Sequence, residues 1–154
     1  MYDIIRGNLD RQAKGIELLR QLLDEEFSLL MDRKTSEVMS LEFSIHELVR
    51  QLAGEKIGVQ TALGGGKVRD YADMLEEDKR ATLHALWSAI DKCEQHCSRQ
   101  ASLNAELSLA LLDQSKSMLT YLHKRIQPQT PSTYTRAGGY LNKRPEAALI
   151  SGRM

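Results

Sequence analysis

Residues 78–126 read DKRATLHALWSAIDKCEQHCSRQASLNAELSLALLDQSKSMLTYLHKRI and contain neither proline nor glycine. Because these two residues are the strongest interrupters of helices, the stretch predicts a single helix over 78–126. At 1.5 Å per residue this helix would be about 70 Å long. Pro128 and Pro131 follow it and predict its end. A helix of this length needs long helical partners, so this segment decides the fold class.

Two earlier segments supply such partners. A seven-residue interval separates the apolar residues of the first, Leu9, Ile16, Leu23 and Leu30. This interval predicts a helix over 3–31. In the second, steps of three and four residues separate Val38, Leu41, Ile45, Leu48 and Leu52, predicting a helix over 35–57. Residues 32–36 contain no glycine or proline, so they could form a sharp turn or only a kink in one long helix.

The remaining segments favour irregular structure. Three successive glycines at 64–66 predict a loop over 58–77, with a short helix starting near Val68. Residues 128–154 are rich in Pro, Gly and Ser and predict a flexible tail. The sequence therefore predicts an all-α fold, an antiparallel long-helix bundle or coiled coil of about three helices in residues 1–127, followed by the tail over 128–154.

The composition of the chain limits the classes of function that it could have. The 154 residues include 21 Lys and Arg and 21 Asp and Glu, so no basic excess points to nucleic acid or an anionic membrane. No segment approaches the ~20 consecutive apolar residues of a membrane span, and no secretion signal opens the chain. We therefore expect a soluble cytoplasmic protein without direct membrane insertion. Cys93 and Cys97 lie four residues apart in a helical pattern, which favours reduced core thiols.

Motifs for catalysis or metal binding are incomplete. His46 and Glu47 begin an HExxH pattern, but Arg50 stands where the second His would be. The GGGK run at 64–67 lacks the leading Gly of a phosphate loop, and Val68 replaces the Ser or Thr that would hold magnesium. The chain has no Glu-x-x-His pair for a di-iron site. We expect no catalytic residues, no metal and no cofactor.

The apolar face of the long helix changes along its length. Leu83, Leu86, Ile90, Cys93 and Cys97 fall within an arc of roughly 80° around the helix, an ordinary buried stripe. From Leu103 onward the arc widens to roughly 200°. The centre of this arc consists of Leu107, Leu111, Met118 and Leu122. One flank consists of Leu112, Leu119 and Ile126, and the other of Leu103, Ala110 and Tyr121. Two interpretations remain open: both flanks are buried by the other helices, or one is a groove for a partner helix.

Asn104 lies in line with this apolar face. A polar residue in a seam can fix the register or oligomeric state of helices, or it can bond to a neighbouring backbone. Asn104 opens the run NAELSLALLDQSKSMLTYLHKRI, which is followed after two prolines by TYTRAGGY at 133–140. An Asn-led amphipathic helix before a tail with Tyr and Gly resembles the FlgN-type flagellar export chaperones, and the likeness extends over nearly the whole chain.

The resemblance implies a function. Such chaperones bind the helical terminal segments of hook-associated proteins, which form the hook-filament junction. They prevent premature assembly and deliver these clients to the export gate of the flagellar type III secretion system. By resemblance, the client-binding residues are Leu107, Leu111, Leu112, Met118, Leu119 and Leu122, and Tyr134 docks the cytoplasmic domain of the gate. The alternative is a self-associating coiled-coil structural or adaptor protein, whose wide apolar arc is buried in a homodimer.

Overall fold

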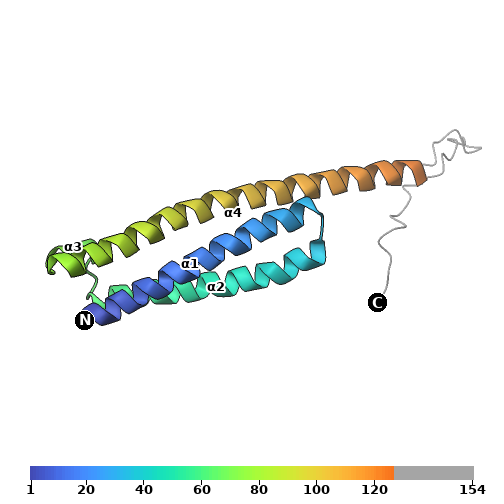
Figure 1. Ribbon diagram of the computed structural model, residues 1–154. Coiled ribbons are helices and arrows are strands. Elements are labelled where there is room, and N and C mark those ends of the chain that lie inside the picture. Colours follow the sequence, from blue (N-terminus) through green and yellow to red (C-terminus); the bar gives the residue numbers. More distant parts are fainter. Residues whose placement is uncertain (127–154) are drawn as a thin grey trace, which may run out of the picture. The chain divides into compact units, whose positions relative to one another are not determined.

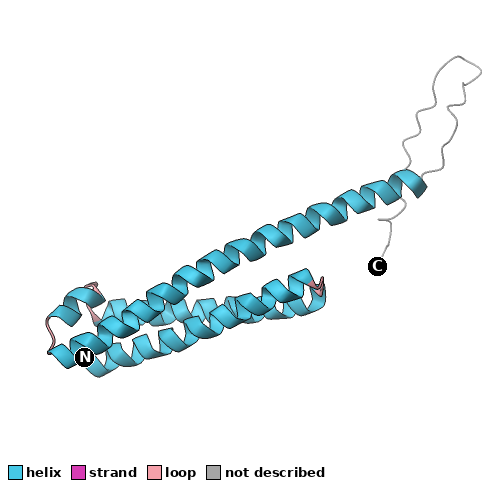
Figure 2. Cartoon of the chain, turned by 45° about the horizontal axis from the view of Figure 1, so that its top comes forward, coloured by secondary structure: helices cyan, strands magenta, loops and turns pink. Residues whose placement is uncertain are grey.

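The computed structural model describes residues 1–126. In this part of the chain α1 spans Tyr2–Met31, α2 Thr35–Ala62, α3 Val68–Asp73 and α4 Glu77–Ile126 (Figure 1). Figure 2 shows that the regular structure of the described residues is entirely helical. The all-α class is therefore confirmed, and α4 begins one residue before the helix that the sequence predicts. None of the helices described here has an apolar stretch long enough to cross a bilayer.

α1 is the central helix of the packing. Its buried residues include a series with alternating steps of four and three, Ile5, Leu9, Gln12, Ile16, Leu19, Leu23, Glu26 and Leu30. This spacing keeps one stripe of the helix facing its neighbours. α2 packs antiparallel to α1. Two contacts at the same separation along the chain, Cys97 with Ile16 and Asn104 with Leu23, show that α4 runs parallel to α1 there.

A tight turn over residues 32–34 separates α1 from α2, so the two are distinct helices rather than one kinked helix. Arg33 has a left-handed backbone with φ of 58°. Its N–H donates to the carbonyl of Leu30, and the N–H of Lys34 donates to that of Leu29. These bonds satisfy carbonyls at the end of α1 that have no partner within the helix. The chain thus reverses without glycine or proline.

α2 is longer than the sequence predicts. The expected end before Gly58 is wrong, because α2 continues to Ala62 and the predicted loop over 58–77 is correspondingly shorter. A β-carbon on Gly58 would lie 3.0 Å from Nδ2 of Asn8, so this glycine permits the close approach of α1. The helix ends before Gly64 and Gly65, which both have positive φ angles.

The chain divides into two compact units, residues 1–109 and residues 110–154. Two apolar clusters fill the first unit. One consists of Ile5, Leu9, Val59, Val68, Ala72, Leu83 and Ile90, and the other of Ile16, Leu19, Leu23, Ile45 and Cys97. In the second unit the described residues, 110–126, are the last turns of α4. The predicted boundary between a body over 1–127 and a tail over 128–154 stays a prediction.

Candidate binding surface on the long helix

α4 buries one residue in every seven, namely Leu83, Ile90, Cys97 and Asn104. Seven residues are nearly two helical turns, so these four side chains lie on one stripe. The same interval leads on to Leu111 and Met118. Leu111 is half-buried, and the Met118 side chain is 64% exposed. The interval that gives α4 its buried stripe therefore continues into Leu111 and Met118, which are more exposed than the four buried residues.

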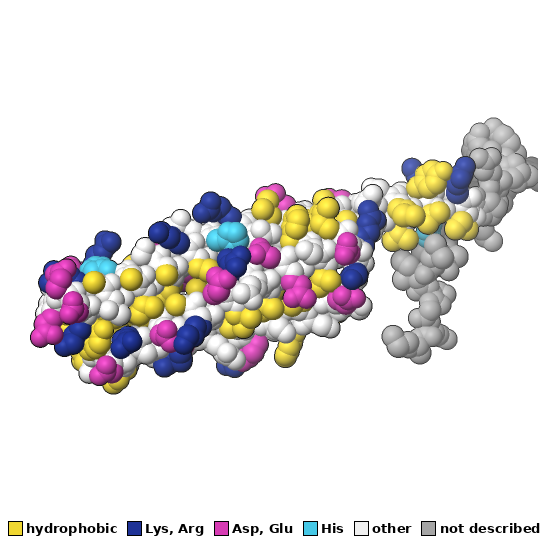
Figure 3. All heavy atoms as spheres, in the orientation of Figure 1, with side chains coloured by type: hydrophobic (Ala, Val, Ile, Leu, Met, Phe, Trp, Pro, Cys, Tyr) yellow, Lys and Arg dark blue, Asp and Glu magenta, His cyan; other side chains and the backbone are white. Residues whose placement is uncertain are grey.

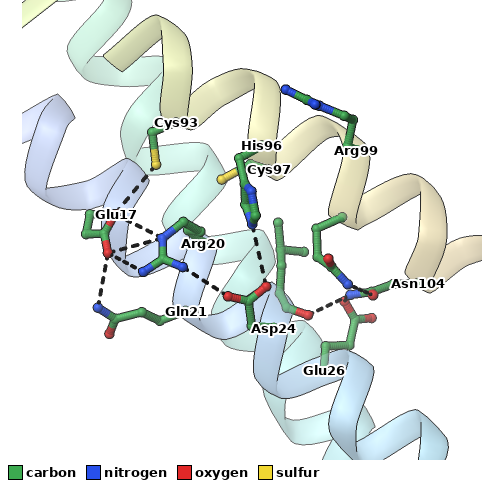
Figure 4. Close-up of polar contacts among 12 residues, drawn as sticks. Glu17, Arg20, Gln21, Asp24, Glu26, Cys93, His96, Cys97, Arg99 and Asn104 are labelled. Atoms are coloured by element: carbon green, nitrogen blue, oxygen red, sulfur yellow. Dashed lines mark hydrogen bonds and ion pairs between the residues drawn. The ribbon is translucent and has the colours of Figure 1, made fainter. Parts of the chain in front are cut away.

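A polar cluster stands at the last buried position of this stripe. Asn104 is 2% exposed, and its Nδ2 donates to the carbonyl oxygen of Leu23 at 2.9 Å and to Oε2 of Glu26 at 2.6 Å (Figure 4). Gln100 Nε2 donates to Oδ1 of Asn104 at 3.0 Å. Because all the polar atoms of the Asn104 amide are used, the side chain ties α4 to α1 at this level.

The Glu26 carboxyl is buried against this amide. Burial raises the pKa of Glu26, the hydrogen bond from Asn104 lowers it, and the neighbouring carboxyl of Glu42 raises it. Burial and the second carboxyl outweigh the hydrogen bond, so the net direction is upward. The cluster is therefore more stable when Glu26 carries a proton than when it is ionised.

The two cysteines lie on the same stripe and donate to α1. The thiols of Cys93 and Cys97 lie 3.5 Å and 3.7 Å from the carbonyl oxygen of Ile16. Both are free, and burial raises the pKa of Cys97 to about 12. A thiol with so high a pKa is a poor nucleophile and a poor metal ligand at neutral pH. Within residues 1–126, no three His, Cys, Asp or Glu side chains are grouped to hold a metal ion.

Charged residues flank the thiols. Arg20 bridges Glu17 at 2.6 Å and Asp24 at 3.2 Å, and His96 of α4 lies 3.7 Å from Asp24 (Figure 4). These groups are partly exposed, so the ion pairs contribute little to stability. They form the polar border of the contact between α1 and α4.

Register along this contact limits what α1 can cover. Cys97 meets Ile16 and Asn104 meets Leu23 at a constant separation of 81 residues. At that separation the last α4 residue of the first unit, Leu109, corresponds to Ser28 of α1. Asn104 is the last residue of α4 that is buried in this unit.

A comparison with models of protein families shows which family the chain belongs to. The family model described as FlgN protein matches residues 1–142, which is most of the chain. The chain belongs to the FlgN family. A search of curated proteins and a search of solved structures gave no match. The resemblance inferred from Asn104 and the TYTRAGGY segment is confirmed.

Family membership gives the function in outline. FlgN proteins are flagellar export chaperones, so this FlgN-family chain is a chaperone of flagellum assembly and type III protein export. Hook-associated proteins are the clients that the family implies. The family is one of chaperones.

The predicted client-binding residues of this FlgN-family chain all lie on the second half of α4. Leu107 and Leu111 are half-buried. The others are 39% to 64% exposed, namely Leu112, Met118, Leu119 and Leu122. Figure 3 shows hydrophobic side chains gathered over the last turns of α4. Tyr134, the predicted gate-docking residue, lies outside the described residues.

Two further exposed apolar features were missed by sequence reasoning. Leu109, 62% exposed, lies about 160° from Leu111 around α4 and so outside the apolar arc that the sequence indicates. On α2, Met39, Phe43 and Ile57 are also exposed. These three residues lie on the side of α2 opposite the residues that predict the helix. The sequence does not show which side is covered, because apolar residues on both sides of a helix weaken its amphipathic pattern.

Proposed function

We propose that this chain is a cytoplasmic chaperone that binds an amphipathic helical terminal segment of a hook-associated protein along residues 107–122 of α4. The supporting observation is that apolar side chains stay exposed along α4 after Asn104, its last buried residue. Residues 110–126 taken by themselves are one helix, which cannot bury its own side chains. A second amphipathic helix laid along this surface would bury them.

Holding the client helix would prevent its assembly with other hook-associated subunits, because the same apolar stripe of the client would be covered. Methionine and leucine suit this role, since their flexible side chains adapt to partners. Delivery would then require a second contact with the cytoplasmic domain of the export gate. We assign that contact to Tyr134.

The test compares two flanks of α4. Leu112→Ala with Leu119→Ala should weaken binding of a hook-associated protein's terminal segment by tenfold or more, because each truncation removes apolar contact of about 1 kcal/mol. The measurement is fluorescence anisotropy of the labelled segment. Thermal unfolding should change little, since both side chains are about half exposed.

Leu103→Ala is the matched control, because Leu103 is 51% exposed but lies on the opposite side of α4 from Leu112. Its affinity for the client segment should equal that of the wild type. Equal loss in both variants would refute this surface. A self-associating structural protein, the alternative, would show no affinity for the client segment in any variant.

A further inference from the structure

The glycine-rich loop between α2 and α3 has no part in the client surface on α4. Gly64 and Gly65 have positive φ angles, and the chain turns there from the end of α2 into α3. The loop and α3 lie at the end of the first unit where α1 begins (Figure 1). Lys67 and Arg69 follow the turn and line a cavity together with Gly65 and Gly66. The loop therefore forms one wall of this cavity.

The cavity has a volume of about 570 Å³ and lies within residues 1–109. Each helix contributes a buried apolar side chain to its lining, namely Leu9 of α1, Val59 of α2, Val68 of α3 and Ile90 of α4. Trp87 of α4 also lines it and is 41% exposed, so the cavity reaches the surface.

The size of the cavity indicates which kind of ligand fits it. Small-molecule sites commonly have volumes of about 300–1,000 Å³. One turn of a helix occupies roughly 400 Å³ at a diameter of about 10 Å, so the cavity has space for little more than one turn of a partner helix. A small molecule therefore fits this space better than a helical segment does.

Two cations of the lining have no partner of opposite charge within residues 1–126. Lys67 and Arg69 are exposed, and neither forms an ion pair with a described residue. The other charged groups of the lining are Lys56 and Glu94, which pair at 3.6 Å, and Asp91. Because Lys56 and Glu94 neutralise each other, two cations remain with one carboxylate. An anionic group on the ligand would balance the remaining charge.

We propose that this cavity binds a small organic anion with an apolar body, which packs on Trp87 and the buried side chains while Lys67 and Arg69 hold its anionic group. The planar guanidinium of Arg donates to oxyanions in a fork, and Lys adds a mobile point charge. Apolar pockets with a few convergent polar groups are the usual form of small-molecule sites. None of the residues assigned to client binding lines the cavity, so the two sites can be tested separately.

Trp87 is the only tryptophan of the chain, so its fluorescence reports on this cavity. The probe is anilinonaphthalene sulfonate, an aromatic sulfonate, added to the full chain. We expect it to quench Trp87 over about 1 to 100 µM, the range for a drug-sized ligand in such a pocket. Leu107, a proposed client-binding residue, lies about 30 Å further along α4 at 1.5 Å per residue. A probe bound there would not contact Trp87.

The double variant of Lys67→Gln with Arg69→Gln tests the two cations. It should bind the sulfonate about tenfold more weakly than the wild type does. Phenylnaphthylamine has the same rings without the charge, and its affinity should not change. Lys92→Gln is the matched control, because Lys92 is an exposed cation beside Asp91 that does not line the cavity. Its affinity for the sulfonate should equal that of the wild type.

Four results would overturn this assignment. The first is no quenching of Trp87 by the sulfonate below about 1 mM. The second is an unchanged affinity in the double variant, and the third is an equal loss in Lys92→Gln, which would indicate general attraction between charges. The fourth is Trp87 emission that changes on dilution without the probe, which would show that a second copy of the chain covers the cavity.

Discussion

Asn104 and Glu26 form a buried polar contact between α1 and α4 in a largely apolar seam. At the sequence level, Asn104 could fix a register or bond to a neighbouring backbone. The structure shows the backbone bond to Leu23 and adds the Glu26 carboxylate, which sequence reading did not connect with it. A polar contact in a seam penalises shifted registers, because each shifted pairing leaves the amide or the carboxyl buried without a partner.

The raised pKa of Glu26 gives a pH-dependent prediction. A carboxyl whose pKa is raised in the folded state contributes stability below its ordinary range and loses it as the pH rises through the folded pKa. Glu26→Gln keeps an acceptor for Asn104 and removes the charge. We expect the variant to be more stable than the wild type at pH 7, by about 1 kcal/mol.

Urea unfolding at several pH values measures this difference. The advantage of Glu26→Gln should shrink as the pH falls below the ordinary range of Glu, where the wild-type carboxyl is protonated in both states. A variant that is less stable than the wild type at pH 7 would show that the ionised carboxylate is favourable at this site.

Tyr134, which lies outside the described residues, gives a second prediction at this scale. Truncating an aromatic anchor commonly costs about 2 kcal/mol of binding, so Tyr134→Ala should bind the cytoplasmic domain of the export gate about thirtyfold more weakly. Client affinity and melting temperature should not change. Tyr140→Ala is the control within the same tail. A lowered melting temperature with unchanged gate affinity would instead mean that the ring packs on the helices.

At the scale of elements, α2 contains two glycines, Gly54 and Gly58, whose surroundings differ. Gly54 has no atom within 4 Å of the position of an added β-carbon, whereas Gly58 is held close to Nδ2 of Asn8. Asn8 is buried and bonded to Arg11, so it has little freedom to move. Glycine therefore stands in two different environments in one helix. At Gly54 there is space for a side chain, whereas at Gly58 the missing side chain permits the close approach of α1.

These two glycines make a matched pair of substitutions. Gly54→Ala should raise the free energy of unfolding by about 1 kcal/mol through helix propensity. Gly58→Ala gains the same propensity but must displace Asn8, so its stabilisation should be smaller or reversed. Chemical denaturation of both variants measures the difference. Equal stabilisation would show that α1 and α2 separate at this point without loss.

At the scale of the whole molecule, both core clusters lie within residues 1–109. The described part of the second unit contributes no buried residue to either cluster. The residues that form the core and those proposed to bind the client therefore lie in different stretches of the chain. Leu107 is the exception, because it is a proposed client-binding residue within residues 1–109. A surface kept for a partner need not be stable alone, since the partner completes its packing.

Truncation after Ile126 tests this division. The shortened chain should keep its helical circular dichroism and its cooperative unfolding, because both apolar clusters of the described residues lie within residues 1–109. It should also bind the client segment as the full chain does, while losing gate binding with Tyr134. Loss of cooperative unfolding would place part of residues 127–154 in the folded core.

The sequence by itself determined the helices and their inward stripes. The interval of Leu9, Ile16, Leu23 and Leu30 and the absence of Gly and Pro from 78–126 are local properties, and helix formation follows local pattern. The family followed from Asn104 and the TYTRAGGY segment, which are also readable in order along the chain. The six residues on α4 were assigned to client binding by resemblance to the family, and that role stays a prediction.

Tertiary structure decided the features that depend on residues far apart in the chain. The continuation of α2 through Gly58 depends on Asn8, and the pairing of Asn104 with Glu26 depends on the register between α1 and α4. The exposed face of α2 emerged only when its opposite side was seen to pack, because a helix with apolar residues on both sides gives no sequence signal for which side is covered. Burial is a property of neighbours, and the neighbours of a long helix are set by packing between segments rather than by its own sequence.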